Sequence, residues 1–75
     1  MTQNAAALAI GKRIRTKMQV HNLTVARAAE LCSLPKPTIE EYLYGKSLPG
    51  AETLVALSRG LGCTTDWLLF GEVAK

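Results

Sequence analysis

The amino-acid sequence predicts an all-α domain of five short helices, and three observations support this prediction. The composition is 48% hydrophobic but 5% aromatic, so the core would consist of Ala, Leu, Ile and Val side chains, which suit packed helices. Apolar residues recur at intervals of three or four along several stretches, which is the spacing of one helix face. Gly and Pro residues separate these stretches and mark the turns between helices.

The length of 75 residues allows one domain, near the lower size at which a core stabilises a fold without disulfides or metal. We expect a flexible N-terminus at 1–6, a folded domain at 7–71 and a C-terminal tail at 72–75. No apolar run approaches the length of a membrane span, and the first basic cluster follows the apolar stretch at the start of the chain. These features predict a cytoplasmic protein without a membrane anchor or a signal peptide.

The first helix should begin near residue 7 and end near residues 20–22, because four apolar residues within it share one face: Ala7, Ile10, Ile14 and Met18. The remaining surface of this helix carries four basic residues, Lys12, Arg13, Arg15 and Lys17. We interpret these charges as a solvated face in preference to a DNA contact, because basic residues on a helix are mostly exposed without a ligand.

A helix-turn-helix is predicted in the middle of the chain. Thr24 is an N-cap signal for a helix at 25–32, since its hydroxyl can accept a hydrogen bond from a free amide of the first turn. Pro35 and Pro37 favour extended backbone at the residues before them. The third helix should therefore begin with Lys36 as its cap and Pro37 as its first helical residue.

The sequence also predicts the faces and ends of the last three helices. In the third helix, three residues should face the core: Ile39, Tyr42 and Leu43. Gly45, which readily takes a positive φ, should end that helix. A fourth helix is expected at 51–60, with Leu54, Leu57 and Leu61 directed inward. A last short helix, capped by Thr64 or Thr65, should end at Phe70, with Gly62 and Gly71 closing the fourth and fifth helices.

Positive charge is concentrated in the half of the chain that contains the predicted helix-turn-helix. Up to Lys46 there are seven basic residues against three acidic ones, and from Ser47 onward there are two against three. The net charge of +3 and the isoelectric point near 9.1 favour a polyanionic partner only weakly. The distribution is the stronger indication.

No catalytic, metal or cofactor site is predicted. Cys32 and Cys63 have neither the CxxC spacing nor the His neighbours of a zinc site, so we interpret them as small buried residues without a disulfide. The sequence has no nucleophile paired with a base, no metal-ligand cluster and no phosphate-binding loop. The chain is therefore not expected to be an enzyme or to bind a small molecule.

Eight residues follow the spacing of a known motif: Leu23, Thr24, Ala29, Thr38, Ile39, Gly45, Lys46 and Pro49. With these residues and the closing string LGCTTDWLLFG at 61–71, the sequence resembles the lambda-repressor and Cro-like helix-turn-helix family. The resemblance covers about residues 10–71. It implies a compact five-helix DNA-binding domain that acts as a transcriptional regulator of the phage or prophage repressor type and binds double-stranded DNA as a homodimer.

The resemblance also implies which residues contact DNA. The third helix, about residues 36–44, would read the major groove with four outward residues: Lys36, Pro37, Glu40 and Glu41. Lys36 would donate to guanine O6 and N7, Pro37 would contact a thymine methyl and Glu41 would accept from cytosine N4. The sugar-phosphate backbone would be contacted by Thr24, Val25, Arg27, Thr38, Tyr44, Lys46 and Ser47. The dimer interface would include Trp67, Leu68 and Phe70, with core packing an equal alternative for Trp67.

The sequence departs from the family pattern at several positions. Val25 stands where many members have a Gln that holds a phosphate, and Ser33 replaces a turn Gly. Met18 and Leu43 replace an Arg and a Glu that meet in many members as a buried ion pair. Because a Glu without its Arg would be buried and unpaired, at a cost of about 3 to 5 kcal/mol, we expect Met18 and Leu43 to be apolar partners in van der Waals contact.

Two alternatives remain open on the sequence. The acidic outer face formed by Glu40 and Glu41 would also suit a protein-interaction module on a helix-turn-helix scaffold, such as an antitoxin or a bridging factor. Arg27 fits a plain surface charge as well as it fits a phosphate contact.

Overall fold

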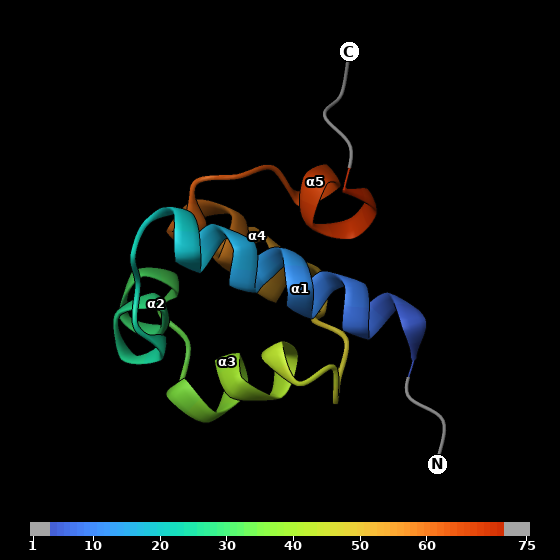
Figure 1. Ribbon diagram of the computed structural model, residues 1–75, viewed down its shortest axis with the longest axis horizontal. Helices are drawn as coiled ribbons and strands as arrows, with labels where there is room; N and C mark the ends of the chain where they lie inside the picture. Colours follow the sequence, from blue (N-terminus) through green and yellow to red (C-terminus); the bar gives the residue numbers. More distant parts are fainter. Residues whose placement is uncertain (1–3, 72–75) are drawn as a thin grey trace.

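The computed structural model describes residues 4–71, which form five α-helices and, within that range, no strand. The helices are α1 (Ala5–Val20), α2 (Val25–Cys32), α3 (Lys36–Leu43), α4 (Ala51–Leu61) and α5 (Thr65–Phe70). The long helix α1 lies across the middle of the molecule, with α3 on one side and α5 on the other (Figure 1). The predicted all-α, five-helix architecture is confirmed.

Helix α1 begins two residues earlier than predicted. The Asn4 side chain caps it, because Oδ1 accepts hydrogen bonds from the amides of Ala6 and Ala7 at 2.8 and 3.4 Å. The predicted flexible segment at 1–6 was therefore too long, since Ala5 and Ala6 are helical. Residues 1–3, and residues 72–75 of the predicted tail, lie outside the described residues.

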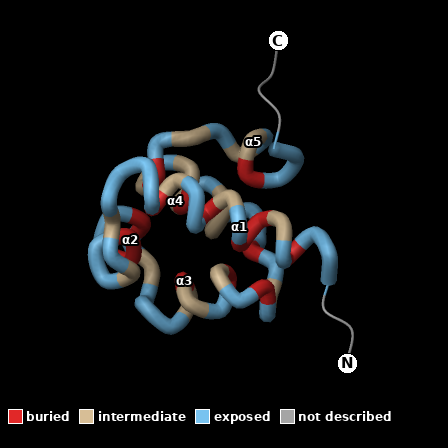
Figure 2. Tube along the Cα trace, in the orientation of Figure 1, coloured by how far each residue is buried: buried red, intermediate tan, exposed pale blue. Residues whose placement is uncertain are grey.

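The core contains side chains from every helix. Its largest fully buried members are Ile14 of α1, Ile39 of α3, Leu57 and Leu61 of α4, and Leu68 of α5. Helix α2 contributes Ala28, Ala29 and Cys32, whose small side chains allow a close approach to its neighbours. In Figure 2 the buried stretches of the tube lie mostly on the inner side of the fold, while exposed stretches form the outer edges of α2 and α3. Each large aliphatic residue contributes about 1.5 to 3 kcal/mol by its burial.

A glycine allows α1 and α3 to pack very closely. A Cβ atom added to Gly11 would overlap the carbonyl oxygen of Tyr42 and would lie 3.2 Å from the carbonyl oxygen of Leu43. Backbone atoms cannot rotate away as side-chain atoms can, so any larger residue would push the helices apart. Gly11 thus sets the position of α3 on α1.

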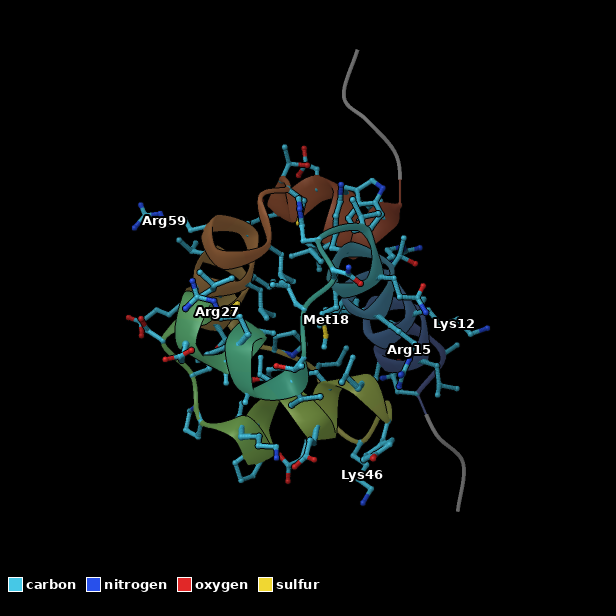
Figure 3. All side chains as sticks on the ribbon, turned by 60° about the vertical axis from the view of Figure 1, so that its left-hand side comes forward. Lys12, Arg15, Met18, Arg27, Lys46 and Arg59 are labelled. Atoms are coloured by element: carbon cyan, nitrogen blue, oxygen red, sulfur yellow. The ribbon has the colours of Figure 1, made fainter. Side chains whose placement is uncertain are left out.

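Met18 and Leu43 belong to one hydrophobic cluster, as the expected apolar replacement of an ion pair requires. Met18 is buried on α1 and points into the interior (Figure 3), and Leu43 is half-buried against the same cluster from α3. Leu43 is therefore not in solvent, in agreement with the predicted register. Direct contact between the two side chains stays a prediction.

Candidate nucleic-acid interface

The turn between α2 and α3 depends on two local features. The Thr24 hydroxyl accepts a hydrogen bond from the Arg27 amide at 3.1 Å, which confirms Thr24 as the cap of α2. Ser33 ends α2 with φ 55° and ψ 41°, a left-handed conformation. This position thus needs the backbone that a Gly adopts freely, and Ser occupies it at a cost of about 1 to 2 kcal/mol.

Helix α3 begins at Lys36, so the expectation that Lys36 is the cap residue was wrong by one position. The cap is Pro35, whose extended backbone directs its carbonyl oxygen at the amides of Thr38 and Ile39, at 3.0 and 3.3 Å. Pro37 then occupies the second helical position, where its missing N–H removes no helix hydrogen bond. Lys36 consequently belongs to the first turn of α3, and its side chain is exposed.

The outer face of α3 presents the residues that were predicted to read bases. Lys36, Pro37 and Glu41 are exposed, whereas Glu40 is half-buried and lies at the border of this face. The opposite face holds the helix in the core through Ile39 and Tyr42, which are both buried as predicted. A rigid helix therefore supports a mixed basic, apolar and acidic surface.

The loop after α3 is fixed by backbone hydrogen bonds. Gly45 takes φ 70°, as predicted; its amide donates to Tyr42 O at 3.1 Å, and the Lys46 amide donates to Glu41 O at 3.0 Å. This pairing is the Schellman arrangement, which satisfies the last carbonyls of a helix. It places Lys46 Nζ 5.7 Å from the centre of the exposed Tyr44 ring. Lys46 projects beside α3 in Figure 3, while Ser47 is half-buried.

The residues at the start of α2 differ in what they can offer a phosphate. Thr24 is exposed, and its hydroxyl can still donate a hydrogen bond while it accepts one from the Arg27 amide. Val25 is half-buried against the core, so only its backbone amide is suited to bind an anion. Arg27 forms an ion pair with Glu30 at 3.3 Å, but both side chains are largely exposed and the pair contributes little stability. Thr38, on α3, is half-buried.

The four basic residues of α1 do not form one solvated face, so that interpretation was wrong for two of them. Lys12 and Arg15 are exposed, on a different side of the molecule from Arg27 and Arg59 (Figure 3). Arg13 and Lys17 are half-buried and contact α5. The charged groups of Arg13 and Lys17 therefore contact α5 of the same chain and do not lie in solvent alone.

The exposure of residues in α5 shows that one part of the predicted dimer interface was wrong. Its cap is Thr64, whose hydroxyl accepts from the Trp67 amide at 3.0 Å, which decides between Thr64 and Thr65. Leu68 is 0% exposed in the core of the single chain, so it is not available to a partner. Trp67 is half-buried, while Phe70 is 67% exposed. The outward apolar residues of α5 are therefore Leu69 and Phe70.

The two cysteines are free. Cys32 is buried as predicted, and Cys63 is half-buried. Burial raises the pKa of both thiols above the ordinary thiol value of 9.0. The neighbouring Cys63 raises the pKa of Cys32 further, whereas the positive charge of Lys17 lowers the pKa of Cys63 and so partly opposes the effect of burial there. Residues 4–71 contain no cluster of His, Cys, Asp and Glu that would hold a metal ion. None of the helices in this range is long and apolar enough to cross a membrane.

Comparison with known proteins identifies similar sequences over most of the chain. The family model described as helix-turn-helix matches residues 12–68. The HTH-type transcriptional regulator DicA of Escherichia coli (strain K12) is 32% identical over 68 residues, which are 91% of this chain and 50% of DicA. Repressor protein C2 of Salmonella phage P22 is 27% identical over 66 residues, which are 88% of this chain and 31% of the repressor. The chain thus spans half or less of the length of these relatives.

Two solved structures resemble the fold closely. The P22 c2 repressor in complex with a synthetic operator has a TM-score of 0.79 and 28% identity, with 84% of this chain and 96% of that chain covered. The restriction-modification controller protein C.AhdI from Aeromonas hydrophila has a TM-score of 0.81 over 87% of this chain and 98% of that chain. Its identity of 18% makes it a likeness of fold alone.

Proposed function

Because the chain belongs to the helix-turn-helix family, we propose that it binds double-stranded DNA by placing the outer face of α3 in the major groove. The observation that carries this proposal is the exposed surface of Lys36, Pro37 and Glu41 on a helix whose other face is anchored in the core. A helix of this kind fits the width of the major groove. The P22 c2 repressor, a relative of the same fold, has been solved with an operator.

Each outward residue of α3 has a distinct role in this proposal. The Lys36 ammonium donates to guanine O6 and N7, and the Glu41 carboxylate accepts from cytosine N4. Pro37 packs against a thymine methyl. Glu40 lies at the border of the face, and with Glu41 it repels phosphates wherever a base contact does not compensate. Specificity therefore comes partly from rejection of wrong sequences.

Residues on either side of α3 hold the sugar-phosphate backbone. On the α2 side these are the Thr24 hydroxyl, the Val25 amide and Arg27. On the other side they are Tyr44, Lys46 and Ser47, with Thr38 between them. Such contacts set the register of α3 in the groove and carry little sequence information.

The DNA-binding form is proposed to be a homodimer that regulates transcription in the cytoplasm as a repressor. A single α3 offers few base contacts, and proteins of this kind bind two half-sites about one helical turn apart. The outward residues of α5, Leu69 and Phe70, supply an apolar surface for a second copy, together with the exposed part of Trp67. No catalytic step belongs to this proposal.

Selection of bound duplexes from a random DNA pool, followed by binding measurements at several salt concentrations, tests the proposal. We expect enrichment of one sequence with two-fold symmetry, and an affinity that falls steeply and linearly with salt on logarithmic scales. If no sequence is enriched and duplex affinity does not depend on salt, the DNA-binding proposal fails. The acidic border of α3 would then favour a protein-interaction module.

A further inference from the structure

Two basic residues of α1 hold α5 in place. Arg13 Nη1 donates to Leu68 O at 3.0 Å and to Leu69 O at 2.9 Å. One turn along α1, Lys17 Nζ lies 4.9 Å from the centre of the Trp67 ring. Both side chains are half-buried. The side of α1 that carries them faces α5.

The C-terminal end of α5 needs these contacts. The helix has six residues, which is too short for stability by itself, and the last four carbonyls of any helix have no partner within it. The Gly71 amide donates a hydrogen bond to Trp67 O at 2.7 Å, and the Arg13 guanidinium donates to the next two carbonyl oxygens, those of Leu68 and Leu69. Hydrogen bonds from a charged donor are about twice as strong as neutral ones.

Gly71 is fitted to the guanidinium. Its φ is +74°, and a Cβ atom added there would lie 2.8 Å from Arg13 Nε. The helix end therefore turns directly against the Arg13 side chain. This close fit distinguishes Arg13 from the exposed charges of α1, such as Lys12 and Arg15.

We propose that Arg13 is a positioning residue for self-association, because it fixes the end of α5 and hence the direction in which Leu69 and Phe70 face a second copy of this chain. The inference rests on the proposed homodimer. Helix α1 packs against α3 through Gly11 and against α5 through Arg13. One rigid helix thus relates the proposed reading helix to the proposed dimer surface, and it sets the spacing of the two α3 helices on DNA.

Substitutions at Arg13 should weaken self-association without affecting binding to one half-site. We expect Arg13→Ala to raise the dimer dissociation constant about tenfold, because the end of α5 loses the two charge-assisted hydrogen bonds that fix its direction. Arg15→Ala is the matched control, because it removes the same charge from an exposed position of the same helix, and it should change the constant by less than about twofold. Sedimentation measures the constant. Trp67, the single tryptophan, reports the position of α5 by its fluorescence, which should shift to the red in Arg13→Ala.

A double-mutant cycle with Phe70→Ala tests whether Arg13 acts through the α5 surface. The two changes should be non-additive: the dimer dissociation constant of the double variant should lie within about twofold of that of the weaker single variant. Additive effects, or a normal dimer in Arg13→Ala while Phe70→Ala dimerises weakly, would overturn the role of Arg13 and leave the dimer intact. Normal self-association in Phe70→Ala would instead refute the proposed dimer surface.

The conservative variant Arg13→Lys keeps the test decisive if Arg13→Ala loses its helical structure. A lysine keeps the charge but cannot reproduce the guanidinium geometry. We expect a dimer weakened about threefold, with unchanged affinity for a duplex that carries one half-site. An unchanged dimer in a folded Arg13→Lys variant contradicts the inference, as does an equal loss of half-site binding.

Discussion

Replacement of Gly11 by Ala should destabilise the domain, although the same change inside a helix ordinarily stabilises it. The usual gain is about 0.5 to 1 kcal/mol, because Ala loses less backbone entropy on folding. Here the new methyl group would overlap the carbonyl oxygen of Tyr42. Separation of α1 from α3 would then loosen the packing around Ile39, so we expect an overpacking cost of about 1 to 3 kcal/mol to exceed the usual gain.

Urea denaturation followed by circular dichroism measures this effect, and the chain supplies a matched control. Gly50 has no atom within 4 Å of an added Cβ and occupies the N-cap of α4. Gly50→Ser should therefore be neutral or stabilise by a few tenths of a kcal/mol. If Gly11→Ala is as stable as the wild type, the helices are not in the close contact that we describe.

The remaining predictions concern the core and the thiols. Leu43→Glu should destabilise the domain more than the double change Leu43→Glu with Met18→Arg; if the double variant is the less stable of the two in urea, the two sites do not meet. Leu43→Ala should lower the free energy of unfolding by about 1 to 3 kcal/mol, because Leu43 is half-buried. Ser33→Gly should raise the unfolding free energy by up to about 1 kcal/mol, since it removes the left-handed strain; a less stable variant in the same assay contradicts this. Burial raises the pKa of Cys32 above 9.0, so the thiol contributes stability that is fully present below that value and is lost as the pH rises through the folded pKa. Unfolding free energies measured across this range should fall less steeply in Cys32→Ala than in the wild type, and equal slopes would refute the assignment.

Features determined by local chemistry could be predicted from the sequence. Thr24 caps the start of α2 with its hydroxyl group, and Gly45 follows the end of α3 because glycine adopts a positive φ freely; both were predicted correctly. The start of α3 was misplaced because Pro35 caps with its carbonyl oxygen alone, so no polar side chain marks the position. Backbone geometry of this kind has little sequence signal.

The features that depend on how α5 packs against α1 were not predicted from the sequence. The run from Trp67 to Phe70 is apolar throughout, so the spacing could not show that Leu68 faces the core and Phe70 the solvent. Arg13 looked like an ordinary surface charge, because its partners are carbonyl groups more than 50 residues away in sequence. Only the packing of α5 on α1 distinguishes Arg13 from Arg15.

The central claim is that the outer face of α3 reads DNA sequence, and a comparison of Lys36→Ala with Lys46→Ala tests it most directly. Affinities of both variants should be measured against the selected duplex and against its single-base-pair substitutions at constant salt. Lys36→Ala should lose about 1 to 3 kcal/mol of discrimination at one base pair, while Lys46→Ala should weaken binding to all duplexes alike. Uniform weakening by Lys36→Ala across every duplex would contradict the claim and make Lys36 a phosphate contact.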